Sequence, residues 1–278
     1  MQVISHSCND IGCILLKMIV LIVITVFIAT IVGSISGIGG GVLIKPVLDA
    51  VTSMPASQIS FLSGITVLTM TIVSLLRSRG GEQKISNTTI FLAIGAAVGG
   101  VVGKKIFDII KTSAGNDAMV SLIQNIVMVI LTVAVFIYTV KKEKIRTMEV
   151  ENKAVIIIAG LVLGILSSFL GIGGGPINLM ILSYLFSMDT KTAALNSLFV
   201  IFFSQVLSLV TTLVTKSVPQ FDWTVLLLMM GFAVCGATLG RTFSKKMTSK
   251  AVDILFMILM GVIIGLSVYN CIRYGMMV

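Results

Sequence analysis

Long apolar stretches, separated by short polar segments, recur along the whole chain. Two shorter apolar runs, residues 42–51 and 176–187, follow the first and the fifth long stretch and predict short helices. The long stretches have the roughly 17–25 residues that a helix needs to cross a membrane, and the pattern therefore predicts an all-α polytopic membrane protein. The eight predicted spans lie near residues 17–36, 59–76, 88–108, 119–140, 153–170, 193–214, 222–243 and 251–271.

The two halves of the chain resemble each other in sequence. Residues 34–41 (Ser-Ile-Ser-Gly-Ile-Gly-Gly-Gly) and 168–175 (Ser-Phe-Leu-Gly-Ile-Gly-Gly-Gly) share six of eight residues at an offset of 134 positions. Residues 99–104 match residues 236–241 at an offset of 137. Three matches in the same order, with Ser63 and Ser197 as the third, indicate an internal duplication.

The duplication predicts two four-helix repeats, residues 1–140 and 154–278, joined by a basic linker at 141–153. An even number of spans in each repeat would give both repeats the same orientation, related by an axis along the membrane normal. Inverted repeats are the alternative, and they require that a short helix also crosses the membrane.

A Gly-Ile-Gly-Gly-Gly motif directly follows the first span of each repeat. Each glycine costs a helix about 1 kcal/mol relative to alanine, so the motif predicts a broken helix. A break within the membrane frees main-chain amides at the positive end of the next helix, which suits an anion. The alternative is close helix packing, which we favour for the 99/103 and 236/240 pairs. The predicted substrate-binding glycines are Gly37, Gly39, Gly40, Gly41, Gly171, Gly173, Gly174 and Gly175.

Four polar side chains near the motifs complete the predicted substrate site: Lys45, Ser63, Asn196 and Ser197. Hydroxyl and amide donors suit an oxyanion in transit, whereas their alternative role is hydrogen bonding between helices. Lys45 either binds the anion or pairs with Asp49, four residues further along the same helix.

Composition excludes a soluble enzyme. The chain of 278 residues is 56% hydrophobic and 11% charged, against about 25% charged residues in an average soluble domain. The net charge of +9 comes from basic residues that flank the apolar stretches. They predict contact with anionic lipids of the bilayer rather than with nucleic acid. With one histidine and no metal-type cysteine spacing, we expect no cofactor, no metal site and no enzymatic activity.

Carboxylates are placed near predicted helix ends rather than at the centres of the spans. The aspartates in question are Asp49, Asp108, Asp189, Asp222 and Asp253. A transporter of metal cations would keep carboxylates within the membrane. The sequence therefore favours an anionic or neutral substrate, and we expect no proton relay through a buried carboxylate.

The paired motifs resemble those of the TauE/SafE family of anion permeases. That family is similar in having two repeated membrane units, each with a Gly-x-Gly-Gly-Gly element, a following proline (here Pro46), a small polar pair (here Asn196-Ser197) and a later glycine-then-basic element (here 103–104 and 240–241). This chain departs from the pattern with Met180 where proline is expected and with Leu62-Ser63 in place of the polar pair.

The resemblance implies a multi-pass protein of a bacterial or archaeal plasma membrane that transports sulfite, sulfonates such as sulfoacetate, or related organic anions. The resulting hypothesis is a secondary transporter that binds a small anion at the two motifs and works by alternating access. An anion channel and a non-transporting structural membrane subunit are the alternatives. The oligomeric state is left open, a homodimer included.

Overall fold

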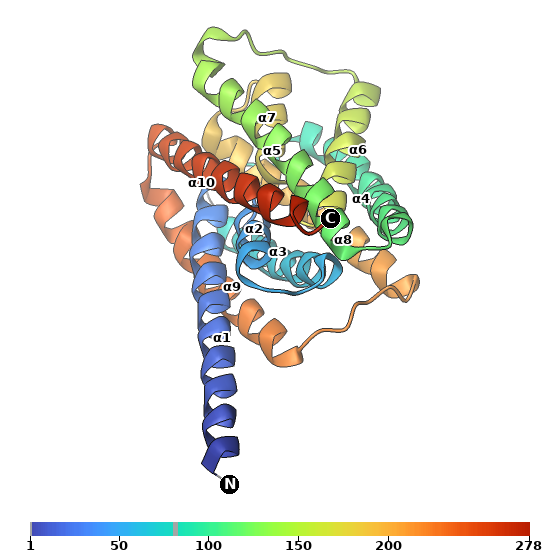
Figure 1. Cartoon of the computed structure of the whole chain (residues 1–278). Coiled ribbons are helices and arrows are strands. Elements are labelled where there is room, and N and C mark those ends of the chain that lie inside the picture. Colours follow the sequence, from blue (N-terminus) through green and yellow to red (C-terminus); the bar gives the residue numbers. More distant parts are fainter. Residues whose placement is uncertain (1, 80–82) are drawn as a thin grey trace.

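The computed structural model describes residues 2–79 and 83–278, with side chains from residue 17 onward. The described residues contain helices and no strands (Figure 1). The helices are α1 (Gln2–Ser36), α2 (Gly41–Val51), α3 (Ala56–Ser78), α4 (Asn87–Ala114), α5 (Asp117–Lys141), the 3-10 turn η1 (Lys142–Lys144), α6 (Lys153–Leu170), α7 (Gly175–Phe186), α8 (Thr190–Val214), α9 (Trp223–Lys246) and α10 (Ser249–Gly275).

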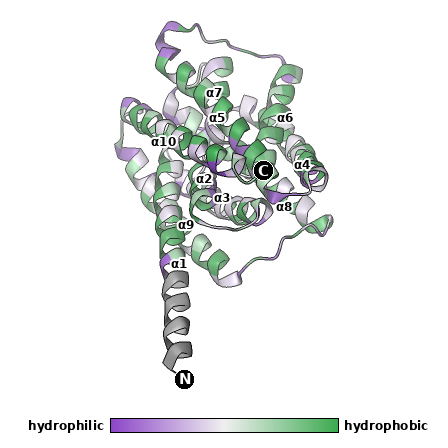
Figure 2. Ribbon diagram, in the orientation of Figure 1, coloured by the Kyte–Doolittle hydropathy of each residue, from purple (hydrophilic) through white to green (hydrophobic). Residues whose placement is uncertain are grey.

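Eight helices in the described part of the chain are long and apolar enough to cross a membrane, which confirms the predicted fold class. The fifth span, Lys153–Leu170, coincides with the predicted one, and the first ends at Ser36 as predicted, in a helix that begins at Gln2. The other six differ only at their ends. Figure 2 shows hydrophobic residues along these helices and hydrophilic residues in the loop between α5 and α6. The short helices α2 and α7 follow α1 and α6, at the places predicted for them.

Polar residues at the first position before a helix set where most helices begin. A side-chain oxygen there accepts a hydrogen bond from an amide of the first turn, which would otherwise have no partner. Asn116 accepts from the amide of Ala118, for example, and Asp222 accepts from that of Thr224 at 2.6 Å. The residues in this role are Ser86, Asn116, Asn152, Asp189, Asp222 and Thr248.

Glycines bring the backbones of two helix pairs into direct contact. A β-carbon on Gly99 of α4 would overlap the carbonyl oxygen of Leu161 in α6. A β-carbon on Gly240 of α9 would likewise overlap the carbonyl oxygen of Ile31 in α1. These contacts favour the packing role of the 99/103 and 236/240 pairs, since only a hydrogen atom fits between the two backbones.

The two halves of the chain are interleaved: helices of one half pack between helices of the other. Helix α4 contacts α6 and α8 of the other half, and α9 contacts α1 and α3. Two buried hydrophobic clusters follow this pairing. One joins α1, α2, α3 and α9 with two residues of α8. The other joins α4 to α8 and α10 with Ile38, Val42 of α2 and Ala56 of α3.

Helices at matching places in the two halves run antiparallel where they meet. Asn125, near the start of α5, accepts a hydrogen bond at 3.4 Å from Asn270, near the end of α10. Lys142, just beyond α5, is 2.6 Å from Asp253, near the start of α10. For the predicted repeats, this orientation of α5 and α10 favours the inverted alternative over the common orientation. The duplication itself stays a prediction from the sequence.

Candidate functional site

Both glycine motifs stand between the end of one helix and the start of the next. After Ser36, the last residue of α1, Gly37 and Gly39 have φ angles of 77° and 79°, and α2 begins at Gly41. In the second motif α6 ends at Leu170, and the four glycines have positive φ angles between 59° and 112°. Positive φ is costly for residues with a β-carbon, so these turns require glycine.

The two motifs lie against each other in the interior of the helix bundle. A β-carbon on Gly39 or on Gly173 would contact the same two side chains, Val67 of α3 and Ile201 of α8. A β-carbon on Gly41 would lie 2.5 Å from the carbonyl oxygen of Ile172. The structure thus brings together the eight glycines named from the sequence, and all of them are buried.

Several amides of the motifs have no hydrogen-bond acceptor. The amide of Gly37 donates to the carbonyl of Gly33 at 2.9 Å, and that of Gly171 donates to the carbonyl of Ser168 at 3.3 Å. Within the described residues, the amides of the two central glycines of each motif (39 and 40, 173 and 174) donate to no main-chain carbonyl. Buried amides are nearly always paired with protein, water or a ligand. These four groups therefore have free capacity to bind an acceptor.

The two serines named from the sequence differ in how their hydroxyls are used. Ser197 of α8 donates a buried hydrogen bond of 2.6 Å to the carbonyl oxygen of Gly37. Ser63 of α3, its counterpart at the offset of 134, is also buried, and its hydroxyl has no partner within the described residues. Ser197 thus ties α8 to the first motif, while Ser63 keeps an unused donor.

Asn196 uses its side chain within the protein. Its Oδ1 accepts from the amide of Ser86 at 3.0 Å and from the hydroxyl of Thr89 at 2.6 Å. Its Nδ2 donates to the carbonyl oxygens of Lys84 and Thr192. The side chain therefore holds the start of α4 against α8, and the structure does not bring it to the central glycines.

Lys45 forms the ion pair that was one of its two alternatives. Its Nζ is 3.6 Å from Asp49 Oδ2, and the two residues are 2% and 0% exposed. The Nζ makes no hydrogen bond within the described residues, and neither does Asp49 Oδ1. The pair is thus close enough for attraction, yet hydrogen bonds satisfy it only in part.

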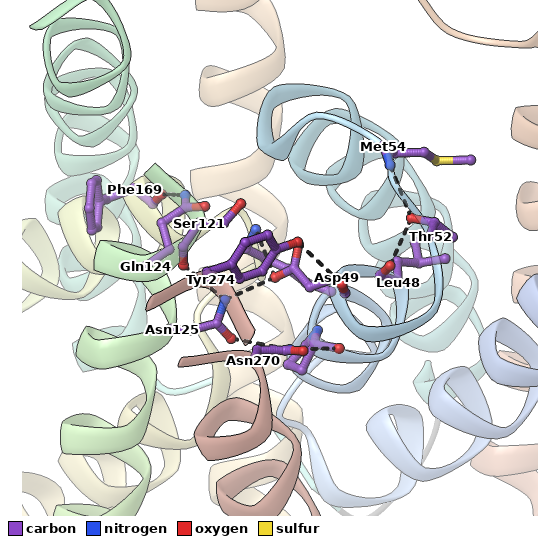
Figure 3. A network of polar contacts seen from close by, with 12 residues as sticks. Leu48, Asp49, Thr52, Met54, Ser121, Gln124, Asn125, Phe169, Asn270 and Tyr274 are labelled. Atoms are coloured by element: carbon purple, nitrogen blue, oxygen red, sulfur yellow. Dashed lines mark hydrogen bonds and ion pairs between the residues drawn. The ribbon is translucent and has the colours of Figure 1, made fainter. Parts of the chain in front are cut away.

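Asp49 is the centre of a polar network between α2, α5 and α10 (Figure 3). Asn125 of α5 donates to Asp49 Oδ2 at 3.2 Å. From α10, Arg273 and Tyr274 donate to the Asp49 carbonyl oxygen at 2.6 Å and 3.2 Å. The carboxylate of Asp49 is buried, although the sequence placed it near a helix end. The residue is near the end of α2, as its position suggested, but α10 covers that helix end.

A polar cavity of about 50 Å³ between α3 and α8 reaches the second glycine motif at Gly171. Ser60 of α3 and Ser168 of α6 line it, and both hydroxyls are buried without a partner within the described residues. Gln205 of α8 and Lys104 of α4 also line it. The cavity therefore combines free hydroxyl donors with one basic side chain.

Sequence reasoning placed neither serine of this cavity in the site, nor Lys104. Lys104 is paired with Asp108 at 2.9 Å and is 13% exposed, so its charge is partly compensated. The available signal was its position after Gly103 in the glycine-then-basic element that recurs at residues 240–241. No group of three His, Cys, Asp or Glu residues within the described ranges is placed to hold a metal ion.

Comparisons with known proteins agree with the resemblance seen in the sequence. The family model described as "Sulfite exporter TauE/SafE" matches residues 22–268. The "Probable membrane transporter protein YunE" of Bacillus subtilis (strain 168) is 24% identical over 273 residues, which cover 88% of this chain and 95% of that protein. No solved structure matches the chain significantly. The chain therefore belongs to the sulfite exporter TauE/SafE family and is a membrane transporter of that type.

Proposed function

We propose that the chain is a secondary carrier that moves a small anion across the membrane by alternating access. Sulfite, a sulfonate such as sulfoacetate, or a related organic anion is the proposed substrate class, because the matching family is described as sulfite exporters. The bacterial relative supports a location in the plasma membrane of a bacterium or an archaeon.

The unpaired amides of the two glycine motifs carry the proposal. Four buried N–H groups from two facing turns have no main-chain acceptor within the described residues. An oxyanion presents several acceptors to such donors, and glycine lets it approach the main chain closely. Hydrogen bonds in which the acceptor is charged are about twice as strong as neutral ones, so a bound anion would satisfy these groups well.

The polar cavity supports a path to these amides. An anion that enters it exchanges water for the hydroxyls of Ser60 and Ser168, while Lys104 supplies positive charge at the lining. Asp108 forms an ion pair with Lys104 and partly neutralises its charge. Lys104 therefore attracts an anion but still lets it dissociate. At Gly171 the cavity ends on the second motif, where the anion would meet the main-chain donors.

Counterflow of radiolabelled sulfite in proteoliposomes tests the proposal. A carrier gives saturable uptake that is accelerated by unlabelled sulfite inside the vesicles. Flux without saturation or counterflow would indicate a channel, and no flux for sulfite or sulfoacetate with folded protein would indicate a structural subunit.

The two cavity hydroxyls provide a matched pair of variants for this assay. The double change Ser60→Ala and Ser168→Ala removes both unpaired donors. We expect it to raise the sulfite concentration that gives half-maximal uptake about tenfold. Ser113→Ala removes a hydroxyl from an exposed position of α4 and should leave uptake unchanged. Equal uptake by both variants would contradict the role of the cavity.

A further inference from the structure

Arg241 of α9 is buried without an acidic partner. Its side chain is 4% exposed, and no carboxylate lies within ion-pair distance in the described part of the chain. Its Nη1 donates to the carbonyl oxygen of Ser34 at the long distance of 3.5 Å, and its buried Nε has no partner within the described residues. A guanidinium has five N–H donors, so this one is poorly satisfied.

The contact with Ser34 does not account for the buried charge. The carbonyls at the end of α1 attract a cation, but such an interaction amounts to a fraction of the cost of burying an unpaired charge. Charged residues inside membrane proteins usually pair with another charge or line a substrate path. The group that would satisfy Arg241 is an anion with several oxygens, which a guanidinium binds through two parallel hydrogen bonds.

Two serines, Ser34 of α1 and Ser74 of α3, lie on the side where Arg241 contacts α1. The hydroxyl of Ser74 in α3 is 3.1 Å from that of Ser34, which is itself 3.2 Å from the carbonyl oxygen of Ala237. Ser78 follows one turn further along α3 and is also buried. Unlike Ser60 and Ser168, these serines donate their hydroxyl protons within the protein, so the free donors at this place are those of the guanidinium.

The two basic residues occupy matching places in the predicted repeats. At the offset of 137, Arg241 corresponds to Lys104, and at the offset of 134, Ser34 corresponds to Ser168 of the cavity. Lys104 has Asp108 four residues later, whereas Arg241 has Lys245 there. Arg241 therefore lacks the neighbouring carboxylate that neutralises Lys104, and a bound anion would compensate its charge.

The two places lie toward opposite ends of α3. Ser60 of the cavity and Ser74 beside Arg241 are separated by 14 residues, or about 21 Å along the helix axis. A second cavity of about 540 Å³ lies near the latter end, lined by Phe199 and Phe202 among others, but its lining does not include Arg241. Ser78 lines this second cavity, but neither cavity reaches Arg241 in this conformation.

We propose that the buried guanidinium of Arg241 is an oxyanion-binding site that is closed in this conformation and receives the anion when the carrier opens to the other side. The inference rests on the proposed anion transport. It assigns the buried guanidinium a ligand, namely a small oxyanion in transit between the glycine motifs and the far side of the membrane.

Four proteins test the inference: the wild type, Arg241→Gln, Arg241→Lys and Lys245→Gln. The last removes one positive charge from an exposed position one turn along α9 and is the matched control. Sulfite binding is measured by calorimetry in detergent, and sulfite counterflow in phosphatidylcholine vesicles. We expect binding about 10- to 100-fold weaker in Arg241→Gln, about tenfold weaker in Arg241→Lys because the planar fork is lost, and within twofold of the wild type in Lys245→Gln.

Each outcome decides the inference. Unchanged sulfite binding and counterflow in a folded Arg241→Gln protein would overturn it and leave anion transport standing. If that variant does not fold, unchanged binding in Arg241→Lys, which keeps the charge, would overturn it equally. An effect seen only in vesicles with phosphatidylglycerol would assign Arg241 to a lipid headgroup instead. No response of the wild type to sulfite or sulfoacetate would overturn the proposed function together with the inference.

Discussion

The two central glycines Gly40 and Gly174 hold the same place in the two motifs, yet we expect them to tolerate alanine very differently. Gly40 has a φ of −64°, and its β-carbon would lie 3.2 Å from the carbonyl oxygen of Ala29. Gly174 has a φ of 112°, and its β-carbon would lie 2.5 Å from Asn178 Nδ2 and 3.0 Å from Ile201. Strain at such a φ costs about 1–3 kcal/mol, and overpacking of a tight interior costs about 1–3 kcal/mol more.

The expected loss for Gly174→Ala is therefore about 2–6 kcal/mol. For Gly40→Ala the mild crowding is offset by about 0.4–1 kcal/mol from the restricted unfolded chain, so its net effect is close to zero. Thermal unfolding in detergent, followed by the fraction that stays monodisperse, measures both variants under one protocol. A similar loss of stability in both, or a stable Gly174→Ala protein, would refute the reasoning from φ and contact distance.

Three further predictions follow from the buried polar groups. Lys45→Met or Asp49→Asn alone should destabilise the protein by about 3–5 kcal/mol, because each leaves a buried charge unpaired. The double variant should lose less stability, and denaturation in detergent measures the difference. Lys104→Gln should weaken sulfite binding about tenfold, whereas Lys105→Gln, at the exposed neighbouring position, should bind as the wild type does. Asn196→Ala removes four hydrogen bonds and should cost about 2–4 kcal/mol in unfolding free energy, and equal stability would contradict its role at the start of α4.

The sequence predicted the features that depend on local chemistry. Hydropathy is a property of each segment, so the span Lys153–Leu170 was located to the residue. The ends of α1 and α6 at the glycine motifs follow from the cost of successive glycines in a helix, which is also local. The predicted spans needed no information about neighbouring helices.

Features that depend on distant segments could not be predicted in this way. Asn196 was assigned to the substrate, but Ser86 and Thr89 occupy its Oδ1 from more than 100 positions away in the chain. Asp49 was judged from its place near a helix end, but Asn125 of α5 and Arg273 of α10 pack against it. In both cases the partner lies on a distant segment, and the sequence does not show that this segment contacts the residue.

The crossed packing of the halves decides which bodies can move in a carrier of this kind. Rocking of residues 1–140 against 154–278 would pull α4 from α6 and α9 from α1, although glycines hold these backbones in direct contact. Bodies that preserve both contacts are α1 to α3 with α9, and α6 to α8 with α4. Each lies mainly in one of the two buried hydrophobic clusters, and one of these clusters also contains α5 and α10. The glycine motifs face each other across the boundary between α3 and α8. In the proposed cycle, opening and closing therefore take place along the α3–α8 contact, with the open cavity at one end and Arg241 near the other.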